Sequence, residues 1–303
     1  MTKSQGVTAA LATVLAVASA QAAWAHTPYL LPNAFDAERD HVTLQGSLTE
    51  DDYFSPDIAL KATAYVETLP NGQIRTLAPA AVLKDVALVE APLEAMGTYR
   101  FSTGQFIARS SKMALVGGKW VMVRPAGMPE RHEPDHASGA DAAKGGDKHG
   151  ERPHGDAPRG VSEADLPAGV KTMLVEGVLT AETYVSKGAP TQAALAVSGK
   201  GLELKPVTHP DSIYVDQGFA FNFLLDGKPA AGVPITVYRS GDAYDEKKIT
   251  AEAKTDAAGA ARVSFERPGV YLLTAHYPAG RPTDSAAPAA RNYVYSLTFE
   301  VTH

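Results

Sequence analysis

The last hundred residues constrain the fold more than any other part of this chain, because they alternate short apolar runs with turn residues. Turn signals stand at Asp226-Gly227, at Asp256 to Gly259 and at Pro268-Gly269. Runs bounded in this way are typical of β-strands. Seven strands in about a hundred residues indicate an immunoglobulin-like β-sandwich. The seven candidate strands are E-L-K-P-V (203–207), F-A-F-N-F-L-L (219–225), V-P-I-T-V-Y (233–238), I-T-A-E-A-K (249–254), A-A-R-V-S-F (260–265), G-V-Y-L-L-T-A-H (269–276) and Y-V-Y-S-L-T-F-E-V (293–301).

The preceding half has the same character with less regular spacing. Asn71-Gly72 is a strong signal for a two-residue hairpin, whereas residues 170–187 are compatible with a strand pair or with a short helix. We therefore predict an all-β protein of two immunoglobulin-like sandwich domains, residues 26–200 and 201–303. The candidate strands of the first domain are residues 42–48, 58–66, 98–104 and 119–125.

A short internal echo links the two predicted domains. M-G-T-Y-R-F-S-T (96–103) is similar to P-G-V-Y-L-L-T-A (268–275). Both segments are expected to be the strand that follows a glycine turn. Tyr271 in the second segment is a candidate for a tyrosine corner, in which the hydroxyl binds the backbone a few residues upstream.

Residues 126–168 have a different composition, with Gly, Pro, Ala, His and charged residues and almost no aliphatic ones. Such a segment buries too little apolar surface to offset its loss of conformational entropy. We expect a disordered loop inserted into the first domain. It carries four of the nine histidines, and these suit loose binding of borderline metal ions, although a solvated polar loop is an equal alternative. The four are His132, His136, His149 and His154.

The first 25 residues are predicted to be a cleaved secretory signal. Lys3 precedes an uncharged apolar run, and Ala23-Trp24-Ala25 is a small-x-small cleavage site. A cut after Ala22 fits the same rule. The run is shorter than the roughly 20 apolar residues that span a membrane, and no later run is long enough. We therefore expect an exported, periplasmic protein without an integral membrane segment.

Composition excludes several functional classes. The chain has no cysteine, so disulfides play no part in its stability. Its net charge of −6, without a basic patch, makes nucleic acid an improbable partner. The sequence has no H-E-x-x-H, no G-x-S-x-G and no phosphate-binding loop. No pair of carboxylates is placed as a general acid and base, so we expect a binding protein and not an enzyme.

His26 is the strongest candidate for a metal ligand. Cleavage before it would make it the first residue, with the α-amine and the imidazole in one chelate ring. An α-amine has a pKa near ~8, so its deprotonation on metal binding near neutral pH costs little. Thr27-Pro28 would stiffen the chain at that point. Alternatively, His26 is an incidental terminal residue.

Further imidazoles would complete the site. His209 lies in K-P-V-T-H-P-D and His276 ends the strand G-V-Y-L-L-T-A-H. His41 opens a strand, and His303 is the last residue. A lone histidine is more often a surface residue or a satisfied one than a ligand.

These segments together resemble a known family. They are A-H-T-P-Y-L-L-P (25–32), L-E-L-K-P-V-T-H-P-D-S-I-Y-V-D-Q-G (202–218), L-L-D-G-K-P-A-A-G-V-P-I-T-V (224–237) and K-T-D-A-A-G-A-A-R-V-S-F-E-R-P-G-V-Y-L-L-T-A (254–275). The pattern is similar to that of an exported family of unknown function associated with nickel and cobalt uptake, described as a nickel-uptake substrate-specific component. The resemblance implies a periplasmic two-sandwich protein that handles a transition metal near an outer-membrane receptor or an inner-membrane transporter. It also implies a mature chain that begins with histidine, and it carries His209 over as a ligand.

The sequence thus predicts a periplasmic protein that binds nickel or cobalt, with copper or zinc as alternatives. Its expected ligands are His26 with His209 or His276. A second hypothesis is a non-catalytic envelope module that binds a protein partner or a glycan. A third is a copper oxidase or oxygenase built on the same N-terminal chelate.

Overall fold

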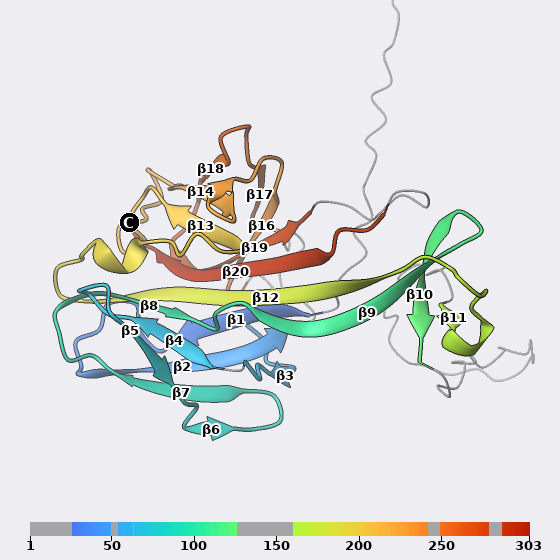
Figure 1. The fold of residues 1–303 in the computed structure, drawn as a ribbon. Coiled ribbons are helices and arrows are strands. Elements are labelled where there is room, and N and C mark those ends of the chain that lie inside the picture. The colour runs from blue at the N-terminus through green and yellow to red at the C-terminus, as the bar shows by residue number, and fades with distance from the viewer. Residues whose placement is uncertain (1–25, 50–53, 63, 126–159, 242–248, 279–286) are drawn as a thin grey trace, which may run out of the picture.

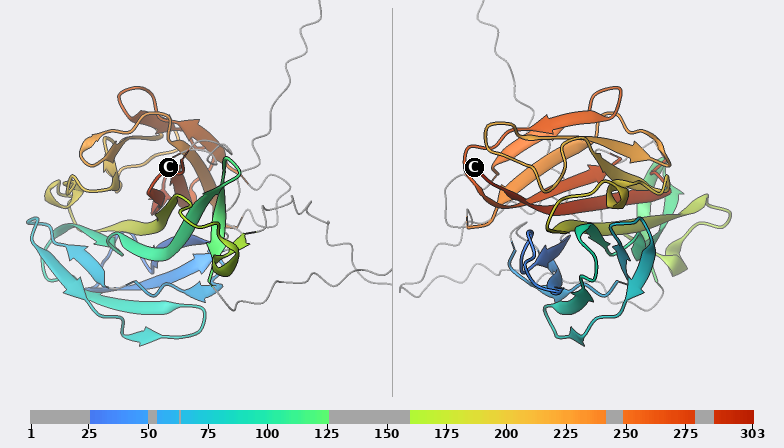
Figure 2. Two further views of the ribbon diagram at one scale, coloured as in Figure 1. Left: turned by 45° about the vertical axis from the view of Figure 1, so that its right-hand side comes forward. Right: turned by 90° about the vertical axis from the view of Figure 1, so that its left-hand side faces the viewer.

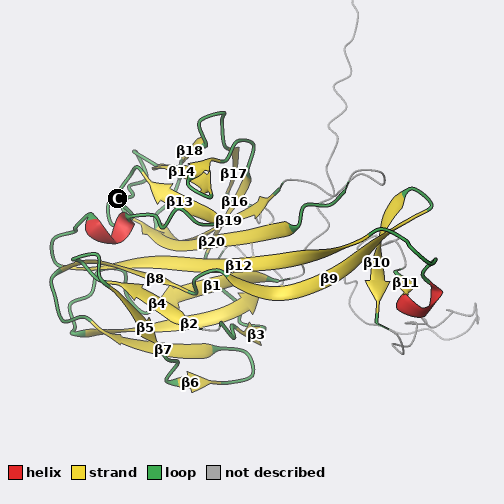
Figure 3. Ribbon diagram, viewed as in Figure 1, coloured by secondary structure: helices red, strands yellow, loops and turns green. Residues whose placement is uncertain are grey.

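The computed structural model describes residues 26–49, 54–62, 64–125, 160–241, 249–278 and 287–303. In these ranges the chain forms twenty strands and two single-turn 3₁₀ helices, η1 (Glu163–Asp165) and η2 (Ala193–Leu195). The prediction of an all-β protein is confirmed (Figure 3). No helix in the described ranges is long and apolar enough to cross a membrane.

The N-terminal half forms a β-sandwich. One of its sheets has the order β1–β2–β7–β6, with β3 paired to β2, and the other consists of β5, β4, β8 and part of β12. The core between them contains Leu30, Val42, Tyr99 and Phe101. The strands of this half are β1 (Thr27–Pro32), β2 (His41–Thr49), β3 (Ile58–Ala59), β4 (Tyr65–Thr68), β5 (Ile74–Leu77), β6 (Ala81–Val82), β7 (Ala87–Pro92), β8 (Gly97–Ser102), β9 (Phe106–Val116), β10 (Lys119–Arg124), β11 (Val161–Ser162) and β12 (Thr172–Lys187).

The C-terminal half forms the second, immunoglobulin-like sandwich. Strands β13, β14, β15 and β18 make one sheet, and β20, β19, β16 and β17 belong to the other. In the core between them, Phe223 contacts both Phe221 and Tyr295 edge to face. All seven predicted strands are present. The strands are β13 (Leu202–Pro206), β14 (Phe219–Leu225), β15 (Lys228–Pro229), β16 (Pro234–Arg239), β17 (Ala251–Lys254), β18 (Ala260–Val263), β19 (Gly269–Tyr277) and β20 (Arg291–Val301).

Strand β12 joins the two halves. It pairs in parallel with β20 and antiparallel with β8 and β9, so one continuous sheet runs through both sandwiches. Figure 1 shows β12 and β20 side by side between the two halves, and the two side views in Figure 2 show one half on each side of them. Val178 and Tyr184 belong to the C-terminal core, whereas Ala181 and Val185 belong to the N-terminal core. Alternate side chains of one strand therefore fill two different cores.

The predicted domain boundary between residues 200 and 201 stays a prediction. Sheet pairing between β12 and β20 crosses it. The sequence left residues 170–187 open between a strand pair and a helix, and in the structure residues 172–187 form the single long strand β12. The run 58–66, predicted as one strand, is divided between β3 and β4.

The predicted hairpin at Asn71-Gly72 joins β4 to β5. Its loop is longer than two residues, because the Leu69 N–H donates to the carbonyl of Gln73 across Pro70, Asn71 and Gly72. Gly72 has a φ of +84°, and its N–H donates to the carbonyl of Leu69. This arrangement is typical of a turn with proline at its second position followed by a left-handed glycine.

The internal echo corresponds to a repeated structure. Gly97 and Gly269 open β8 and β19 with φ values of +123° and +144°, which favour glycine. Two residues later, the Tyr99 hydroxyl donates to the carbonyl of Ala95, and that of Tyr271 donates to the carbonyl of Arg267. Each hydroxyl thus binds the carbonyl four residues upstream. Tyr271 forms the predicted tyrosine corner, and Tyr99 forms its counterpart in the other sandwich.

An extension of the long sheet projects beyond both cores (Figure 1). We call it the β9–β10 arm, meaning residues 109–116 of β9, β10 and residues 172–177 of β12. The C-terminal boundary predicted for the disordered loop, residues 126–168, is wrong, because its last residues are ordered. Val161 and Ser162 form β11, which pairs with the edge of β10, and η1 follows. The Lys112 ammonium is 2.7 Å from the Glu163 carboxylate, so these residues are tied to the arm. Residues 126–159 lie outside the described ranges.

Candidate metal centre at the start of β1

The residues that follow His26 are buried, which fixes its position. Strand β1 pairs with β2 from Thr27 opposite Thr49 to Pro32 opposite Leu44. Thr27, Tyr29 and Leu30 are buried, and Ser296 of β20 donates its hydroxyl to the carbonyl of Pro28. His26 is therefore attached directly to a strand held between the two halves, and its side chain is 28% exposed.

His26 contacts a carboxylate. Its Nε2 is 3.1 Å from Oδ2 of Asp57, which immediately precedes β3. The Asp57 N–H donates to the carbonyl of Leu48, and this bond holds Asp57 beside β2. A carboxylate cannot donate when ionised, so Nε2–H is the donor in this pair with a neutral ring. The tautomer places the lone pair on Nδ1, the ring nitrogen that closes a chelate with the α-amine of the same residue.

His209 is engaged by the protein on both ring nitrogens. Its Nε2 is 3.0 Å from the carbonyl oxygen of Thr191, and its Nδ1 accepts the N–H of Asp211 at 3.1 Å. A carbonyl only accepts, so the ring is the Nε2–H tautomer. A metal ion would have to displace one of these two bonds. These two bonds hold the loop of His209 against Thr191, which precedes η2.

His276 lies near the end of β19, opposite Val294 of β20. It is half-buried. His41 opens β2, with Nδ1 3.0 Å from the carboxylate of Asp40, and His303 is exposed at the end of the chain. Across the described ranges, no three His, Cys, Asp or Glu side chains come together in a way that could hold a metal ion.

The predicted ligands therefore do not form one centre from side chains alone. His26, His209 and His276 are not brought together, and His26 has Asp57 as its carboxylate neighbour. A centre at His26 needs the α-amine as its second nitrogen. The loose secondary candidates His132, His136, His149 and His154 lie outside the described residues.

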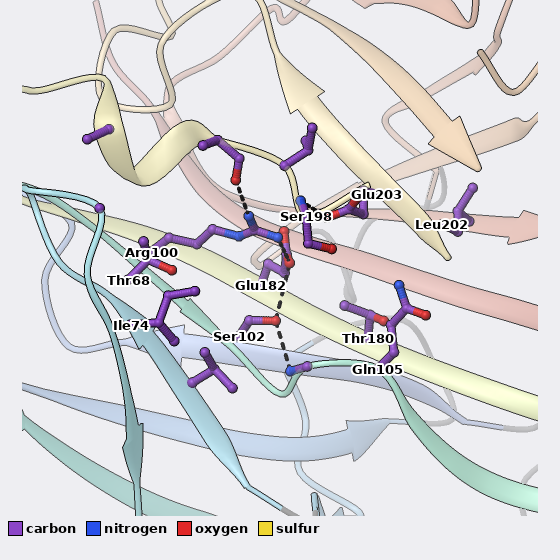
Figure 4. Close-up of a pocket in the computed structure, with 16 residues that line it drawn as sticks. Thr68, Ile74, Arg100, Ser102, Gln105, Thr180, Glu182, Ser198, Leu202 and Glu203 are labelled. Carbon is purple, nitrogen blue, oxygen red and sulfur yellow. Dashed lines mark hydrogen bonds and ion pairs between the residues drawn. The ribbon is translucent and has the colours of Figure 1, made fainter. Parts of the chain in front are cut away.

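A cavity of about 310 Å³ opens between β4, β8, β12 and the segment after η2 (Figure 4). Its polar lining includes Arg100, Ser102, Glu182 and Glu203. Glu203 is already satisfied, because its carboxylate accepts the N–H groups of Ser198, Gly199 and Lys200. The cavity is within the range of small-molecule sites in size, but its polar groups are bonded mainly to one another.

A buried ion pair lies at this cavity. Arg100 of β8 binds Glu182 of β12, and both side chains are largely buried, with 12% and 2% exposed. Tyr295 of β20 donates to the same carboxylate at 2.7 Å, and Ser102 donates at 3.2 Å. Burial alone would lower the pKa of Arg100, but the charge of Glu182, the nearby Tyr184 and Tyr295, and the hydrogen bond to Glu182 together outweigh burial and raise it. The group connects three strands across both halves.

Sequence reasoning missed this ion pair. The available signal was a charge inside each of two otherwise uncharged strand segments, Arg100 in G-T-Y-R-F-S and Glu182 in L-T-A-E-T-Y-V. Charged residues are rarely fully buried unless they are paired. Such positions in neighbouring strands are therefore candidates for one buried pair.

Comparison with known proteins gives little beyond the family. No curated protein matches the chain. Among solved structures, the D0-D1 domain of Intimin aligns over 89% of this chain and 96% of its own, with 11% identity and a TM-score of 0.20. The Bacillus anthracis TIE protein aligns over 91% of this chain and 57% of its own, with 10% identity and a TM-score of 0.15. Similarities this low carry no argument about function.

The match to a family model is extensive. It covers residues 23–279, which include His26, the N-terminal half, the C-terminal half as far as β19, and the residues around the cavity. The chain belongs to the family described as Domain of unknown function (DUF4198).

Proposed function

We propose that this protein is an exported transition-metal-binding protein that acts in metal uptake or delivery. Nickel or cobalt is the expected cargo, with copper or zinc as alternatives. The proposal includes cleavage before His26, a periplasmic location, and a receptor in the outer membrane or a transporter in the inner membrane as partner. No catalytic step is part of it.

The contact between His26 and Asp57 carries the proposal. In metal sites, the second nitrogen of a ligating histidine commonly donates to a carboxylate, which fixes the ring and raises its basicity. Asp57 stands in that position toward Nε2, at 3.1 Å. The α-amine and Nδ1 then offer two nitrogens to one ion, a donor type that suits nickel, cobalt, copper and zinc. Nitrogen sites favour copper over nickel intrinsically, so availability would decide the cargo.

The test is a calorimetric titration with Ni²⁺ of the protein that begins at His26. We expect one tight site, and we expect His26→Ala to weaken it by about a hundredfold or more, since loss of the imidazole leaves the α-amine without its chelate partner. His41→Ala is the matched control, because His41 also contacts an aspartate through one ring nitrogen. Its affinity should equal that of the unmodified protein.

Equal nickel affinity in the His26→Ala and His41→Ala proteins would contradict the proposal. Any binding would then come from other histidines, and the hypothesis of an envelope module that binds a protein or a glycan would take precedence.

A further inference from the structure

Three methionines lie in one row across the β9–β10 arm. Met113 of β9 is directly opposite Met122 of β10, and it is also directly opposite Met173 of β12. Residues opposite each other in adjacent strands place their side chains on the same face of a sheet. The three thioethers therefore share one face, with Met113 in the middle. We call Met122, Met113 and Met173 the methionine row.

The methionine row is accessible to solvent. Met122 is 42% exposed, and Met113 and Met173 are half-buried. The arm projects beyond both hydrophobic cores (Figure 1), so neither core covers this row with buried residues. Large apolar side chains in register on an exposed sheet face call for an explanation other than core packing.

The neighbouring rows on the same face set the chemistry. Trp120, two residues from Met122, belongs to the next row, and the Lys171 ammonium lies 6.0 Å from the centre of its ring. Arg124 lies two residues from Met122 on the other side. Two cationic side chains beside three neutral sulfurs disfavour a hard divalent cation. A soft monovalent ion, which binds through sulfur and not through charge, tolerates them better.

We propose that the methionine row is a binding site for a soft monovalent metal ion, of which Cu⁺ is the biological example. Thioethers select this class of ion. Methionine has three rotatable bonds, so adjacent sulfurs can converge on one ion. The site is separate from the centre proposed at His26, which uses nitrogen ligands for divalent ions.

Sheet geometry makes Met113 the essential ligand. Directly opposite residues have Cβ atoms about 5 Å apart, a distance that two thioethers bridge through one ion. Met122 and Met173 are separated by two strand spacings, or about 10 Å, which is too far for the pair to share an ion without Met113. Every arrangement of the site therefore includes Met113 and at least one outer methionine.

The first experiment follows the methionine methyl groups by NMR while Ag⁺, a redox-inert analogue of Cu⁺, is added to the chain that begins at His26. We expect saturable shifts at one equivalent for Met113 and for one or both outer methionines. Met96, which is 65% exposed and outside the row, is the internal control and should not move. Unmoved row methyls, or equal shifts of Met96, would overturn the proposal.

The second experiment measures Cu⁺ affinity by anaerobic competition with a chromogenic chelator, with Trp120 emission as a further readout. Met113→Leu keeps the apolar bulk and should weaken binding by about a hundredfold, whereas Met122→Leu or Met173→Leu should weaken it by about tenfold. Met96→Leu should change nothing. Equal Cu⁺ affinity in Met113→Leu and Met96→Leu would overturn the proposal. Ni²⁺ titration of Met113→Leu keeps the two sites distinguishable, because the His26 centre should be unaffected.

Discussion

At the scale of single residues, the fold holds His26 in a defined position. The side chain follows directly from β1 and rests against Asp57, whose backbone is tied to β2. A terminal residue without a role is normally frayed. Here the adjacent Thr27 is only 3% exposed, so the backbone that carries His26, the proposed chelating residue, is fixed by the fold itself.

Asp57→Asn should weaken Ni²⁺ binding by about 10–100-fold, the usual effect of losing a carboxylate that orients a histidine ligand. The amide keeps the size of the side chain but not its charge. Calorimetry on the protein that begins at His26 measures the change, with Asp40→Asn beside His41 as control. An affinity equal to that of the control would show that Asp57 does not orient a ligand.

Glu67 makes a second prediction at this scale. Its side chain is fully buried on β4, it binds Arg75, and its Oε1 atom has no hydrogen-bond partner within the described structure. Burial raises the pKa of Glu67, and Arg75 opposes the shift only in part. A raised pKa in the folded state means that the folded protein keeps the carboxyl proton of Glu67 at pH values at which the unfolded chain has lost it. The stabilisation is therefore complete below about pH 4.3, the pKa of an unperturbed Glu, and is lost as pH rises through the folded pKa.

As the pH rises from about 4, the unmodified protein should therefore lose unfolding free energy relative to the Glu67→Gln variant. Urea unfolding at a series of pH values measures it. A difference that is constant with pH, or that shifts the other way, would contradict the raised pKa.

At the scale of elements, β12 explains both the architecture and a limit of sequence reasoning. Its residues from Gly177 to Ser186 are buried without interruption. A strand that is buried on both faces lacks the alternation of apolar and polar residues that identifies a strand with one exposed face. For this reason the sequence left residues 170–187 open between a strand pair and a helix. The seven C-terminal strands were predictable because turn residues bound each of them.

The ion pair between Arg100 and Glu182 should be among the most sensitive positions. Glu182→Gln leaves the Arg100 charge buried without its partner, and the expected cost is about 3–5 kcal/mol of unfolding free energy. The double variant Arg100→Met with Glu182→Leu should recover most of this loss, because apolar residues of similar size often replace buried pairs well. Denaturant unfolding measures both. A loss below about 1 kcal/mol, the range of an exposed pair, would contradict a buried role.

At the scale of the whole molecule, the two sandwiches share a sheet and a strand. A chain that begins at residue 201 contains all seven predicted strands of the C-terminal domain but lacks β12, and with it Val178 and Tyr184 of the C-terminal core. It would also leave one edge of β20 unpaired, and exposed strand edges promote aggregation. We expect this fragment to be unfolded or aggregated by circular dichroism and size-exclusion chromatography. A chain that begins at residue 172 is the control, and equal folding of the two would show independent domains.

The sequence predicted the fold class and both sandwiches, because turn residues are local signals, whereas the role of His26 and the cleavage before it stay predictions. It could not predict Asp57 or the methionine row, because these depend on pairing between distant strands. His209 illustrates a further limit, since the same T-H-P-D segment fits a metal ligand and a histidine bonded to Thr191 and Asp211. Only the three-dimensional arrangement distinguishes a histidine satisfied by the protein from one placed for a metal.

In the function that we propose, His26 binds metal because cleavage makes it the first residue. The most direct measurement compares Ni²⁺ binding by a chain that begins at His26 with one that carries a single additional Ala before it. The extra residue removes the chelate between α-amine and Nδ1 but keeps the imidazole and its contact with Asp57. We expect tight, one-to-one binding only in the chain that begins at His26. Equal affinity of the two chains would contradict it.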